Sequence, residues 1–188
     1  MTTNKLNVGA KQEFGQPLPN FSLLLLNGCG PRTLQDYLRH KMGAVIVFWS
    51  AMCAHCRRYD EYFNSFGELH GQLGFAAIAS RSRETPSQIE SASKQRGLEF
   101  PILLDTSGEV AHRWYAQQTP RSYLLAPSGQ LVYRGAIDNF KLPADDGYVA
   151  FLEPAINSYL AGQPVARAET ASFGCAIEST YYNLPRQL

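Results

Sequence analysis

The residues of this chain best suited to chemistry are Cys53 and Cys56, which frame the stretch Cys53-Ala54-His55-Cys56. Such a pair can be half of a zinc site, a structural disulfide or a redox-active dithiol. Zinc normally takes four ligands, commonly from two such pairs, and the remaining cysteines and the four histidines form no second pair. A disulfide across so short a loop constrains the unfolded chain very little. The spacing therefore favours a redox dithiol.

The sequence around the pair predicts the elements that a reactive thiolate needs. A near-continuous apolar run at residues 44–50 predicts a central strand covered on both faces. Aromatic residues at helical spacing then predict a helix from about Cys53 to His70. At the start of this helix, free N–H groups and the helix dipole would stabilise a Cys53 thiolate, and a protonated His55 would add positive charge. Cys56, one turn further on and more sheltered, is the predicted resolving thiol.

A second feature, Thr119-Pro120, stands just before a predicted strand. A proline that opens a strand often has no further role. The alternative is a cis proline that lets the Thr119 backbone pair with a bound peptide or a partner disulfide. Because cis bonds make up only about 5 % of X-Pro bonds in folded proteins, the pattern alone leaves both interpretations open.

The composition describes an ordinary soluble domain. The chain has 188 residues, of which 45 % are hydrophobic and 18 % charged, and its net charge is +1. This length allows a sizeable core, and the charge gives no basic field that would attract nucleic acid or an anionic membrane surface. No apolar run approaches the ~20 residues of a membrane span, and residues 1–14 lack the apolar centre of a signal peptide. We expect a cytoplasmic protein if Met1 is native, or one of the periplasm or cell envelope if a signal segment has been removed.

Turn and capping signals divide the chain into alternating elements. Thr33 is a plausible N-cap, Thr85 and Gln88 have capping-box spacing with Pro86 at the first helical position, and Pro154 should kink or split the last helix. The predicted strands lie at about residues 21–25, 44–50, 74–80 and 100–105 and in a hairpin over 121–135; the predicted helices lie at about 33–38, 53–70, 86–96, 107–116 and 145–160.

This order of elements defines the fold class and the organisation of the chain. Strands that alternate with helices make an α/β sheet with helices on both faces, and the hairpin adds an antiparallel edge. We expect a mobile N-terminal segment at residues 1–15, one domain at residues 16–162 and a tail of little periodicity at residues 163–188.

Taken together, these motifs resemble the thioredoxin-like superfamily, and within it the redoxin/AhpC-TSA and TlpA-like branch of thiol-disulfide oxidoreductases. The resemblance is carried by the Gly-Pro-Phe entry segment at residues 15–28, by the strand, Phe-Trp and CxxC at residues 45–56, and by residues 97–135, which lead through Thr119-Pro120 into the hairpin. It extends over about residues 15–162, and its motifs occur in the expected order.

The resemblance implies a thioredoxin fold with a central mixed sheet, an N-terminal extension and a helical insertion around residues 85–97. It implies that Cys53 is the nucleophile, Cys56 the resolving thiol and Pro120 a cis proline beside them. The redox-active Cys53–Cys56 disulfide would serve without a separate cofactor or metal, and the partner would be a protein bearing a thiol or a disulfide. Trp49 resembles the aromatic residue that usually precedes the motif and lines the substrate groove; a core aromatic that ends a strand is the alternative.

Several positions depart from the pattern of the family. Thioredoxin itself carries Gly-Pro between the cysteines, whereas Ala54-His55 resembles the oxidising DsbA and protein disulfide isomerase motifs and indicates a less reducing potential. Val47 replaces the buried Asp of thioredoxin, and Tyr59 stands where TlpA-like members often have a Glu. Asp60 is the remaining candidate for a proton-shuttling carboxylate, with an ordinary surface acid as the alternative.

Two other functions compete with disulfide exchange. A peroxiredoxin-like peroxidase would use Cys53 in a Pro-x-x-x-Thr-x-x-Cys setting, but Ser50 stands at the Thr position and Ile46 at the Pro position, so the pocket is not made. A non-catalytic thioredoxin-fold binding module would not need an intact CxxC. We therefore predict an enzyme, a thiol-disulfide oxidoreductase that exchanges disulfides with protein partners.

The two remaining cysteines lie outside the motif. Cys29 is in a Gly-rich turn, and Cys175 is in a tail that resembles the Gly-Cys ending of some longer redoxin-family proteins. They can be two unrelated free thiols. In the alternative interpretation, Cys175 folds back near the main body as an extra resolving or regulatory thiol.

Overall fold

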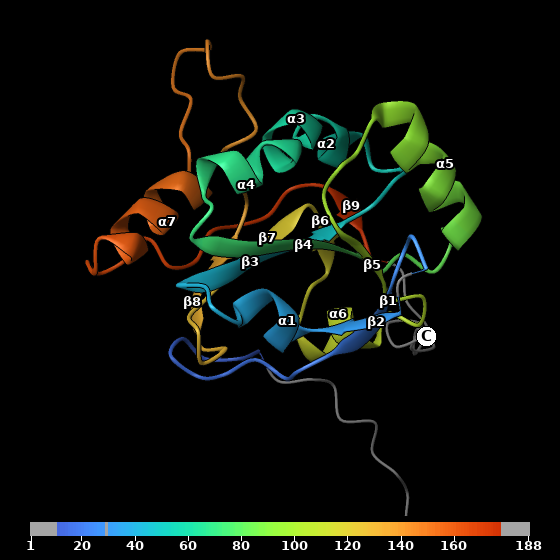
Figure 1. Cartoon of the computed structure of the whole chain (residues 1–188). Coiled ribbons are helices and arrows are strands. Elements are labelled where there is room, and N and C mark those ends of the chain that lie inside the picture. Colours follow the sequence, from blue (N-terminus) through green and yellow to red (C-terminus); the bar gives the residue numbers. More distant parts are fainter. Residues whose placement is uncertain (1–10, 29, 178–188) are drawn as a thin grey trace, which may run out of the picture.

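The apolar run around residues 44–50 forms the central strand of the structure, a computed structural model that describes residues 11–28 and 30–177 (Figure 1). The strands are β1 (Ser22–Leu25), β2 (Pro31–Thr33), β3 (Gly43–Trp49), β4 (Leu73–Ala79), β5 (Ile102–Leu104), β6 (Gln118–Thr119), β7 (Arg121–Leu125), β8 (Leu131–Gly135) and β9 (Cys175–Ala176). The helices are α1 (Leu34–Leu38), α2 (Ala54–Arg57), α3 (Asp60–Asn64), α4 (Phe66–Leu69), α5 (Pro86–Arg96), α6 (Glu109–Arg113) and α7 (Leu152–Leu160).

The main sheet has the strand order β2-β1-β5-β4-β3-β7-β8. Strands β3, β4 and β5 are parallel to one another, as expected for strands joined by helical crossovers. The hairpin of β7 and β8 adds antiparallel strands beside β3, and β1 pairs antiparallel with β5 at the other side. The predicted mixed α/β sheet with an antiparallel hairpin at its edge is confirmed.

Helices cover both faces of the main sheet (Figure 1). The side chains of β3 alternate between these two layers. Val45, Val47 and Trp49 face the core beneath α3, α4, α5 and α7, whereas Ile46 and Phe48 face the core that includes α1 and α6. Every residue of β3 is buried, as the apolar run predicts for a strand covered on both faces. This buried strand ends at Trp49, four positions before Cys53.

The local start and stop signals are confirmed at two helices. Thr33 caps α1 in a capping box with Asp36. Thr85 caps α5 in a capping box with Gln88, and α5 ends at Gly97 in the left-handed conformation (φ 60°). Both caps satisfy N–H groups that a helix start leaves without partners.

The single helix predicted over residues 53–70 is wrong, because the structure divides this segment into α2, α3 and α4. The Asn64 side chain bonds the Gly97 carbonyl at 2.8 Å and the Glu99 N–H at 2.9 Å. The Tyr59 hydroxyl donates to Asp138 at 2.7 Å. Aromatic residues, Asn and Ser are weak helix formers, so these contacts with distant residues decide the local backbone.

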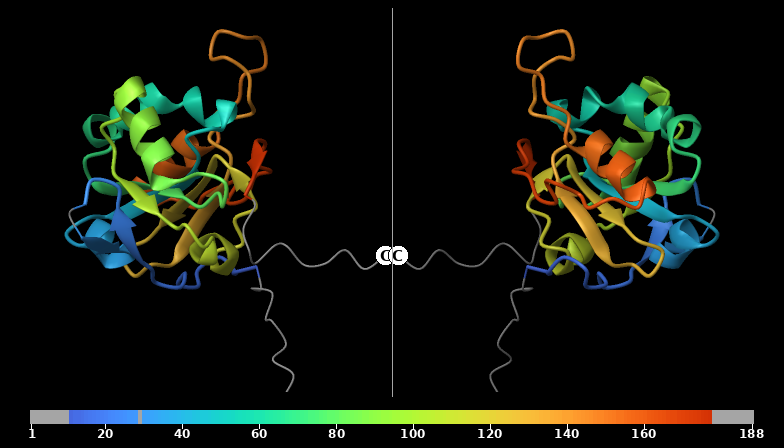
Figure 2. Two further views of the ribbon diagram at one scale, coloured as in Figure 1. Left: turned by 90° about the vertical axis from the view of Figure 1, so that its right-hand side faces the viewer. Right: turned by 90° about the vertical axis from the view of Figure 1, so that its left-hand side faces the viewer.

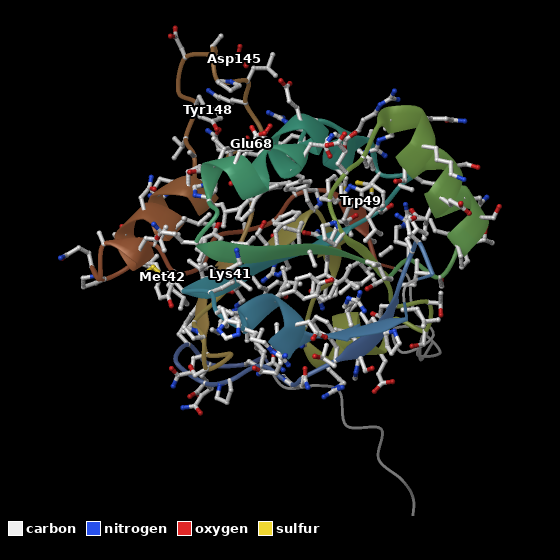
Figure 3. The ribbon with its side chains drawn as sticks, viewed as in Figure 1. Lys41, Met42, Trp49, Glu68, Asp145 and Tyr148 are labelled. Carbon is white, nitrogen blue, oxygen red and sulfur yellow. The ribbon has the colours of Figure 1, made fainter. Side chains whose placement is uncertain are left out.

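The last helix also differs from the prediction, because α7 begins at Leu152 instead of residue 145. Residues 139–149 form a projecting loop, which carries Asp145 and Tyr148 in Figure 3 and is closed by a bond from the Asn139 N–H to the Val149 carbonyl at 2.9 Å. Pro154 therefore lies in the first turn of α7. A missing N–H costs nothing there, so the predicted kink or split does not occur.

The described part of the N-terminal segment and the C-terminal tail both bond to residues of β8, which can be followed in Figure 2. Near the N-terminus, the Gln12 carbonyl accepts a bond from Arg134 at 2.7 Å, and Gly15 donates to Leu131 at 2.9 Å. In the tail, the Arg134 N–H donates to the Ala168 carbonyl at 3.0 Å, and the Thr170 N–H donates to the Arg134 carbonyl at 3.2 Å. Residues 1–10 and 178–188 lie outside the described residues, and the division into a domain at 16–162 with two terminal segments stays a prediction.

Candidate active site

Strand β3 and the turn after it deliver the two motif cysteines to the start of α2. Cys53 is the N-cap residue of α2, with φ −83° and ψ 112°. Cys56 lies one turn inside, where its N–H donates to the Cys53 carbonyl at 3.0 Å. Both are free thiols, and Cys53 is only 1 % exposed. Because α2 has four residues, its dipole is much smaller than that of the long helix expected from the sequence.

The two thiols have opposite acidities. A hydrogen bond from Cys56 is the largest cause that lowers the pKa of Cys53; together with smaller contributions from Cys175 and Thr119, it outweighs burial and brings the pKa to about 4. Burial raises the pKa of the Cys56 thiol well above its ordinary value, and its hydrogen bond to Cys53 adds to the effect. Cys53 is therefore a thiolate at neutral pH, whereas Cys56 holds its proton.

A buried carboxylate that the sequence analysis missed supports the turn before Cys53. Glu84 accepts hydrogen bonds from the Ser50 hydroxyl, from the Ala51 N–H at 3.0 Å and from the Met52 N–H at 3.2 Å. Its side chain is 1 % exposed, and Arg81 lies 3.7 Å away. Glu84 precedes a capping box and belongs to no recognisable motif, so spacing alone could not have identified it.

The Thr119-Pro120 bond is cis, as the second interpretation of the sequence predicted. Thr119 is fully buried, and its carbonyl oxygen lies 3.3 Å from the Cys53 Sγ. The structure therefore brings Thr119, Pro120 and the CxxC together, although β6 and α2 lie far apart in the sequence.

Cys175 joins this group from the tail of the chain. Strand β9 pairs antiparallel with β6 (Figure 1), and Cys175 stands directly opposite Thr119. The Thr119 hydroxyl donates to the Cys175 carbonyl at 3.4 Å. Burial, followed by the hydrogen bond to Cys53 and the charge of its thiolate, raises the pKa of Cys175 to about 11. The tail thus folds back to the main body, as one interpretation of the sequence expected, whereas Cys29 lies outside the described residues.

The other candidate residues lie around the cysteines in different ways. The half-buried His55 ring packs edge-on against Phe140 with centroids 4.7 Å apart. Trp49 is fully buried and lies between the sheet and α5 (Figure 3), with the Arg96 guanidinium 5.2 Å from its ring centroid. This is the position of a core aromatic instead of a groove residue.

The Asp60 carboxylate forms an ion pair with Arg96 and accepts its Nε–H at 2.7 Å. Arg96 also donates to the Ala51 carbonyl at 2.9 Å. Asp60 therefore holds α3 and α5 together beside the Cys53 turn. This role differs from that of the proton-shuttling carboxylate considered from the sequence.

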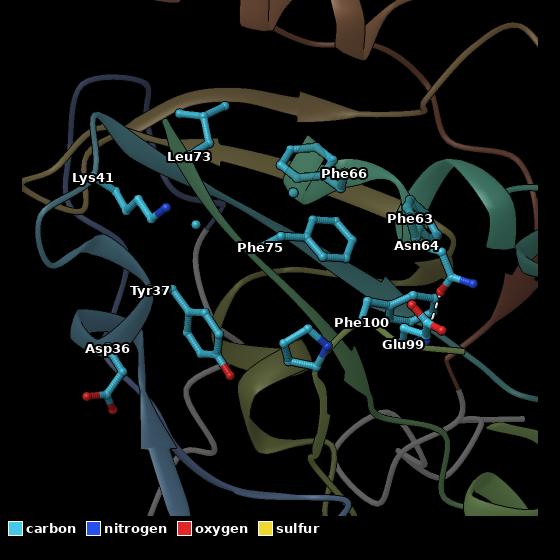
Figure 4. Close-up of a pocket in the computed structure, with 13 residues that line it drawn as sticks. Asp36, Tyr37, Lys41, Phe63, Asn64, Phe66, Leu73, Phe75, Glu99 and Phe100 are labelled. Carbon is cyan, nitrogen blue, oxygen red and sulfur yellow. Dashed lines mark hydrogen bonds between the residues drawn. The ribbon is translucent and has the colours of Figure 1, made fainter. Parts of the chain in front are cut away.

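A separate pocket of about 380 Å³ contains none of the cysteines and lies among α1, α4 and β4 (Figure 4). Tyr37, Lys41, Phe66 and Phe75 are among the residues that line it. Within residues 11–28 and 30–177, no three His, Cys, Asp or Glu side chains gather as a metal site. In the same part of the chain, no helix is long and apolar enough to cross a membrane.

Comparisons with known proteins agree with this geometry. The thiol-disulfide oxidoreductase ResA of Bacillus thuringiensis is 28 % identical over 122 residues, which cover 65 % of this chain and 69 % of the relative. A hypothetical protein from Sinorhizobium meliloti has a TM-score of 0.78 and 26 % identity, covering 91 % of this chain and 97 % of its own. A putative thiol:disulfide interchange protein DsbE from Chlorobium tepidum shares the fold with a TM-score of 0.63 and 19 % identity, covering 80 % of this chain and 99 % of its own.

Fold and relatives together define a thioredoxin-like thiol-disulfide oxidoreductase. Residues 14–134 match the AhpC/TSA family, and the chain belongs to that family. The resemblance found in the sequence, the fold class and the class of enzyme are confirmed.

Proposed function

We propose that this protein exchanges disulfides with protein partners through Cys53 and Cys56. The Cys53 thiolate attacks one sulfur of a partner disulfide, and the other partner sulfur leaves as a thiolate. Cys56 then loses its proton and attacks the Cys53 Sγ, which releases the second partner sulfur and leaves a Cys53–Cys56 disulfide. The same steps in reverse oxidise a partner dithiol. In this mechanism the dithiol is the whole redox group, and no separate cofactor takes part.

The observation that carries the proposal is the opposite acidity of the two thiols. An ordinary thiol with a pKa near 8.5 is only a few per cent thiolate at pH 7. The hydrogen bond from Cys56, with smaller contributions from Cys175 and Thr119, lowers the pKa of Cys53 to about 4. The reacting thiolate is therefore present at neutral pH, while Cys56 stays protonated until a mixed disulfide removes the Cys53 charge beside it.

The direction of electron flow follows from the same difference. A low pKa stabilises the reduced form of the couple, and this makes the disulfide a stronger oxidant. We propose a reduction potential above that of thioredoxin (about −270 mV) and toward that of DsbA (about −120 mV). Ala54-His55 between the cysteines, which resembles oxidising motifs, supports the same direction.

The contacts of Ser50 favour disulfide exchange over a peroxidase. A peroxiredoxin would direct a Thr hydroxyl at this position toward the reacting cysteine. Here the Ser50 hydroxyl donates to Glu84, and Ile46 is buried in β3. Peroxide consumption is therefore expected to be negligible beside the exchange of disulfides.

The test uses the full chain with Cys29→Ser as the common background, so that the cysteines under study are the only reactive ones. Reduction of a protein disulfide is measured for this parent and for the Cys53→Ser and Cys56→Ser variants. Cys53→Ser should abolish turnover, because it removes the attacking thiolate. Cys56→Ser combined with Cys175→Ser should leave partners attached to Cys53, because no second cysteine of the centre remains to release them. Turnover that survives Cys53→Ser would reject the proposal, and rapid peroxide consumption by the parent would favour the peroxidase.

The cytoplasm and the cell envelope, the two predicted compartments, would hold the Cys53 and Cys56 pair in different oxidation states. A cytosolic glutathione pool would keep an oxidising dithiol reduced, whereas an oxidising envelope would keep it as a disulfide. Acid quenching of cells followed by alkylation and mass spectrometry distinguishes the two placements.

A further inference from the structure

The tail reaches Cys53 by a path that is fixed before and after Cys175. Before it, the Thr170 hydroxyl bonds the Tyr133 hydroxyl at 2.7 Å and the Ala136 N–H at 3.0 Å. After it, Ile177 is 4 % exposed in the core, and its N–H donates to the Gln117 carbonyl at 2.8 Å. Two anchors on opposite sides place Cys175 at a defined position beside β6.

The approach of the tail depends on the residue before Cys175. A Cβ atom built on Gly174 would lie 1.9 Å from the Thr119 carbonyl oxygen, which is much shorter than any real contact. Glycine is therefore needed for the backbones of β6 and β9 to come this close. The Thr119 carbonyl in turn lies 3.3 Å from the Cys53 Sγ.

The exposure of the three cysteines forms a gradient from the surface inward. Cys175 is half-buried, Cys53 is 1 % exposed and Cys56 is fully buried. Cys175 also pairs with the Thr119 backbone, which is where an extended peptide carrying a reactive cysteine could add as a strand. The tail thus presents its own cysteine to Cys53 in the manner of a bound partner.

We propose that Cys175 is a third reacting thiol of this centre, which exchanges with the Cys53–Cys56 disulfide to form an alternative Cys53–Cys175 disulfide within the chain. The proposal rests on the proposed function, because that reaction supplies the Cys53–Cys56 disulfide. It extends the function by giving the buried dithiol an outer sulfur that solvent and partner thiols can reach.

The exchange is balanced without any external oxidant. The Cys175 thiolate attacks the Cys53 Sγ, a Cys53–Cys175 bond forms, and the Cys53–Cys56 bond breaks with Cys56 as the leaving thiolate. Cys175 gives up one proton and Cys56 takes one, so the number of electrons and protons in the chain stays the same. The half-buried Cys175 has replaced the fully buried Cys56 as the disulfide partner of Cys53.

The charges around Cys175 support this order of events. In the reduced protein, the Cys53 thiolate and its hydrogen bond add to burial in raising the pKa of Cys175. Once Cys53 is in a disulfide, those two contributions vanish. Cys175 therefore becomes a better nucleophile in the one state that offers it a sulfur to attack.

The tether favours the internal reaction over reaction with free partners. A group held by a short linker has an effective concentration on the order of millimolar. Because β9 is already paired with β6, little further ordering is required. An external thiol at micromolar concentration should therefore react with Cys53 more slowly than Cys175 does.

The experiment maps disulfides in the Cys29→Ser parent and in its Cys56→Ser and Cys175→Ser variants, with glutathione disulfide as the oxidant. After acid quenching and alkylation, trypsin cuts behind Lys41, Arg57, Arg167 and Arg186, so Cys53 and Cys56 share one peptide and Cys175 lies in another. In Cys56→Ser, we expect peptides 42–57 and 168–186 to be joined by a disulfide. In Cys175→Ser, only the Cys53–Cys56 bond should form.

The outcomes separate this proposal from the proposed function. If Cys53 of Cys56→Ser carries glutathione while Cys175 stays free, the third-thiol proposal is overturned and Cys53 remains the nucleophile. If Cys53 takes neither glutathione nor Cys175 in any variant, the proposed function itself fails.

Gly174→Ala provides a control that leaves the Cys53 and Cys175 thiols in place. In combination with Cys56→Ser, it should push β9 away from Thr119 and lower the ratio of Cys53–Cys175 disulfide to Cys53–glutathione on the order of tenfold, as expected when a tethered group loses its effective concentration. An unchanged ratio with unchanged circular dichroism would show that the fixed position of the tail does not govern the exchange, and would overturn the proposal.

Discussion

The Cys53 thiol is enclosed by two segments that the chain builds in contrasting ways. Residues 50–57 follow β3 directly, and a strand, a turn and the first turn of a helix present both motif cysteines. Residues 169–177 arrive from the far end of the chain, and their hydroxyl and carbonyl groups bond residues 34 to 56 positions away. The position of residues 50–57 follows from neighbouring residues in the sequence, whereas the position of residues 169–177 depends on contacts with distant residues.

The difference shows that the acidity of a thiol in a sequence motif can also depend on a distant segment that no motif marks. The hydrogen bond from Cys56 is the largest cause of the low pKa of Cys53, and Cys175 adds a smaller one. The local segment therefore makes the largest contribution to the low pKa of Cys53, and the tail makes a smaller one. The predictions below test this ranking.

The largest expected effect is on the pH dependence of Cys53 alkylation. In the reduced parent, the rate should stay high at neutral pH and fall as Cys53 is protonated, with a midpoint near its pKa of about 4. Cys56→Ala should raise this midpoint strongly, and Cys175→Ala should raise it less, because each removes one hydrogen bond to the thiolate. Iodoacetamide labelling of Cys53, followed by mass spectrometry, measures the midpoints. Equal shifts in the two variants would contradict the ranking of motif above tail.

Glu84→Ala should have the next largest effect, on the local segment. It leaves the Ser50 hydroxyl and the N–H groups of Ala51 and Met52 without their acceptor. Losing such buried partners should lower the free energy of unfolding by about 2–3 kcal/mol, measured by urea denaturation. Because Glu84 positions the turn that carries Cys53, the midpoint of Cys53 alkylation should shift as well. Glu84→Gln keeps one acceptor oxygen and should recover part of both effects; recovery of neither would contradict the positioning role.

The sequence predicts the local side of this comparison well. A buried strand, two capping boxes and the CxxC are contained in short windows, so β3, α1, α5 and the position of Cys53 at a helix start follow from neighbouring residues. The pattern alone does not decide whether the Thr119-Pro120 bond is cis, although the family resemblance implies that it is, and the structure has it cis.

The remaining features depend on partners that are distant in sequence. Asn64 is the last residue of α3, where the expected long helix is interrupted, and its side chain bonds the loop after α5. Glu84 approaches the Cys53 turn only when β3 and β4 lie side by side. The pairing of β9 with β6 requires Thr170 and Ile177 to be anchored elsewhere. Periodicity over a short window contains none of this information.

Thr170→Val should have a smaller effect, and it should be confined to the tail. It keeps the shape of the side chain and removes the oxygen that bonds Tyr133 and Ala136. The free energy of unfolding should fall by about 1–2 kcal/mol, and Cys175 should be alkylated faster. Ser128→Ala, which removes an exposed hydroxyl, is the matched control and should change stability by less than about 0.5 kcal/mol. Unchanged labelling of Cys175 would mean that the tail is not held through Thr170.

His55→Ala should have the smallest effect, although His55 lies inside the motif. The hydrogen bonds that lower the pKa of Cys53 come from Cys56, Cys175 and Thr119, while the His55 ring packs against Phe140. Its contribution is then only the charge it carries when protonated. Removing that charge should raise the pKa of Cys53 and lower the reduction potential by less than about 30 mV, which corresponds to about 1.4 kcal/mol for a two-electron couple.

Equilibration with glutathione buffers measures this potential, and His55→Phe keeps an aromatic ring against Phe140 without the charge. If both variants lower the potential equally, the charge is the cause, and if only His55→Ala does so, ring packing is. The shift of the potential in His55→Ala and the shift of the Cys53 alkylation midpoint in Cys175→Ala can both be converted to free energies. A larger free energy for His55→Ala would reverse the expected order of these two effects. The motif residue between the cysteines would then outweigh the tail, and the distant segment would matter for the third thiol alone.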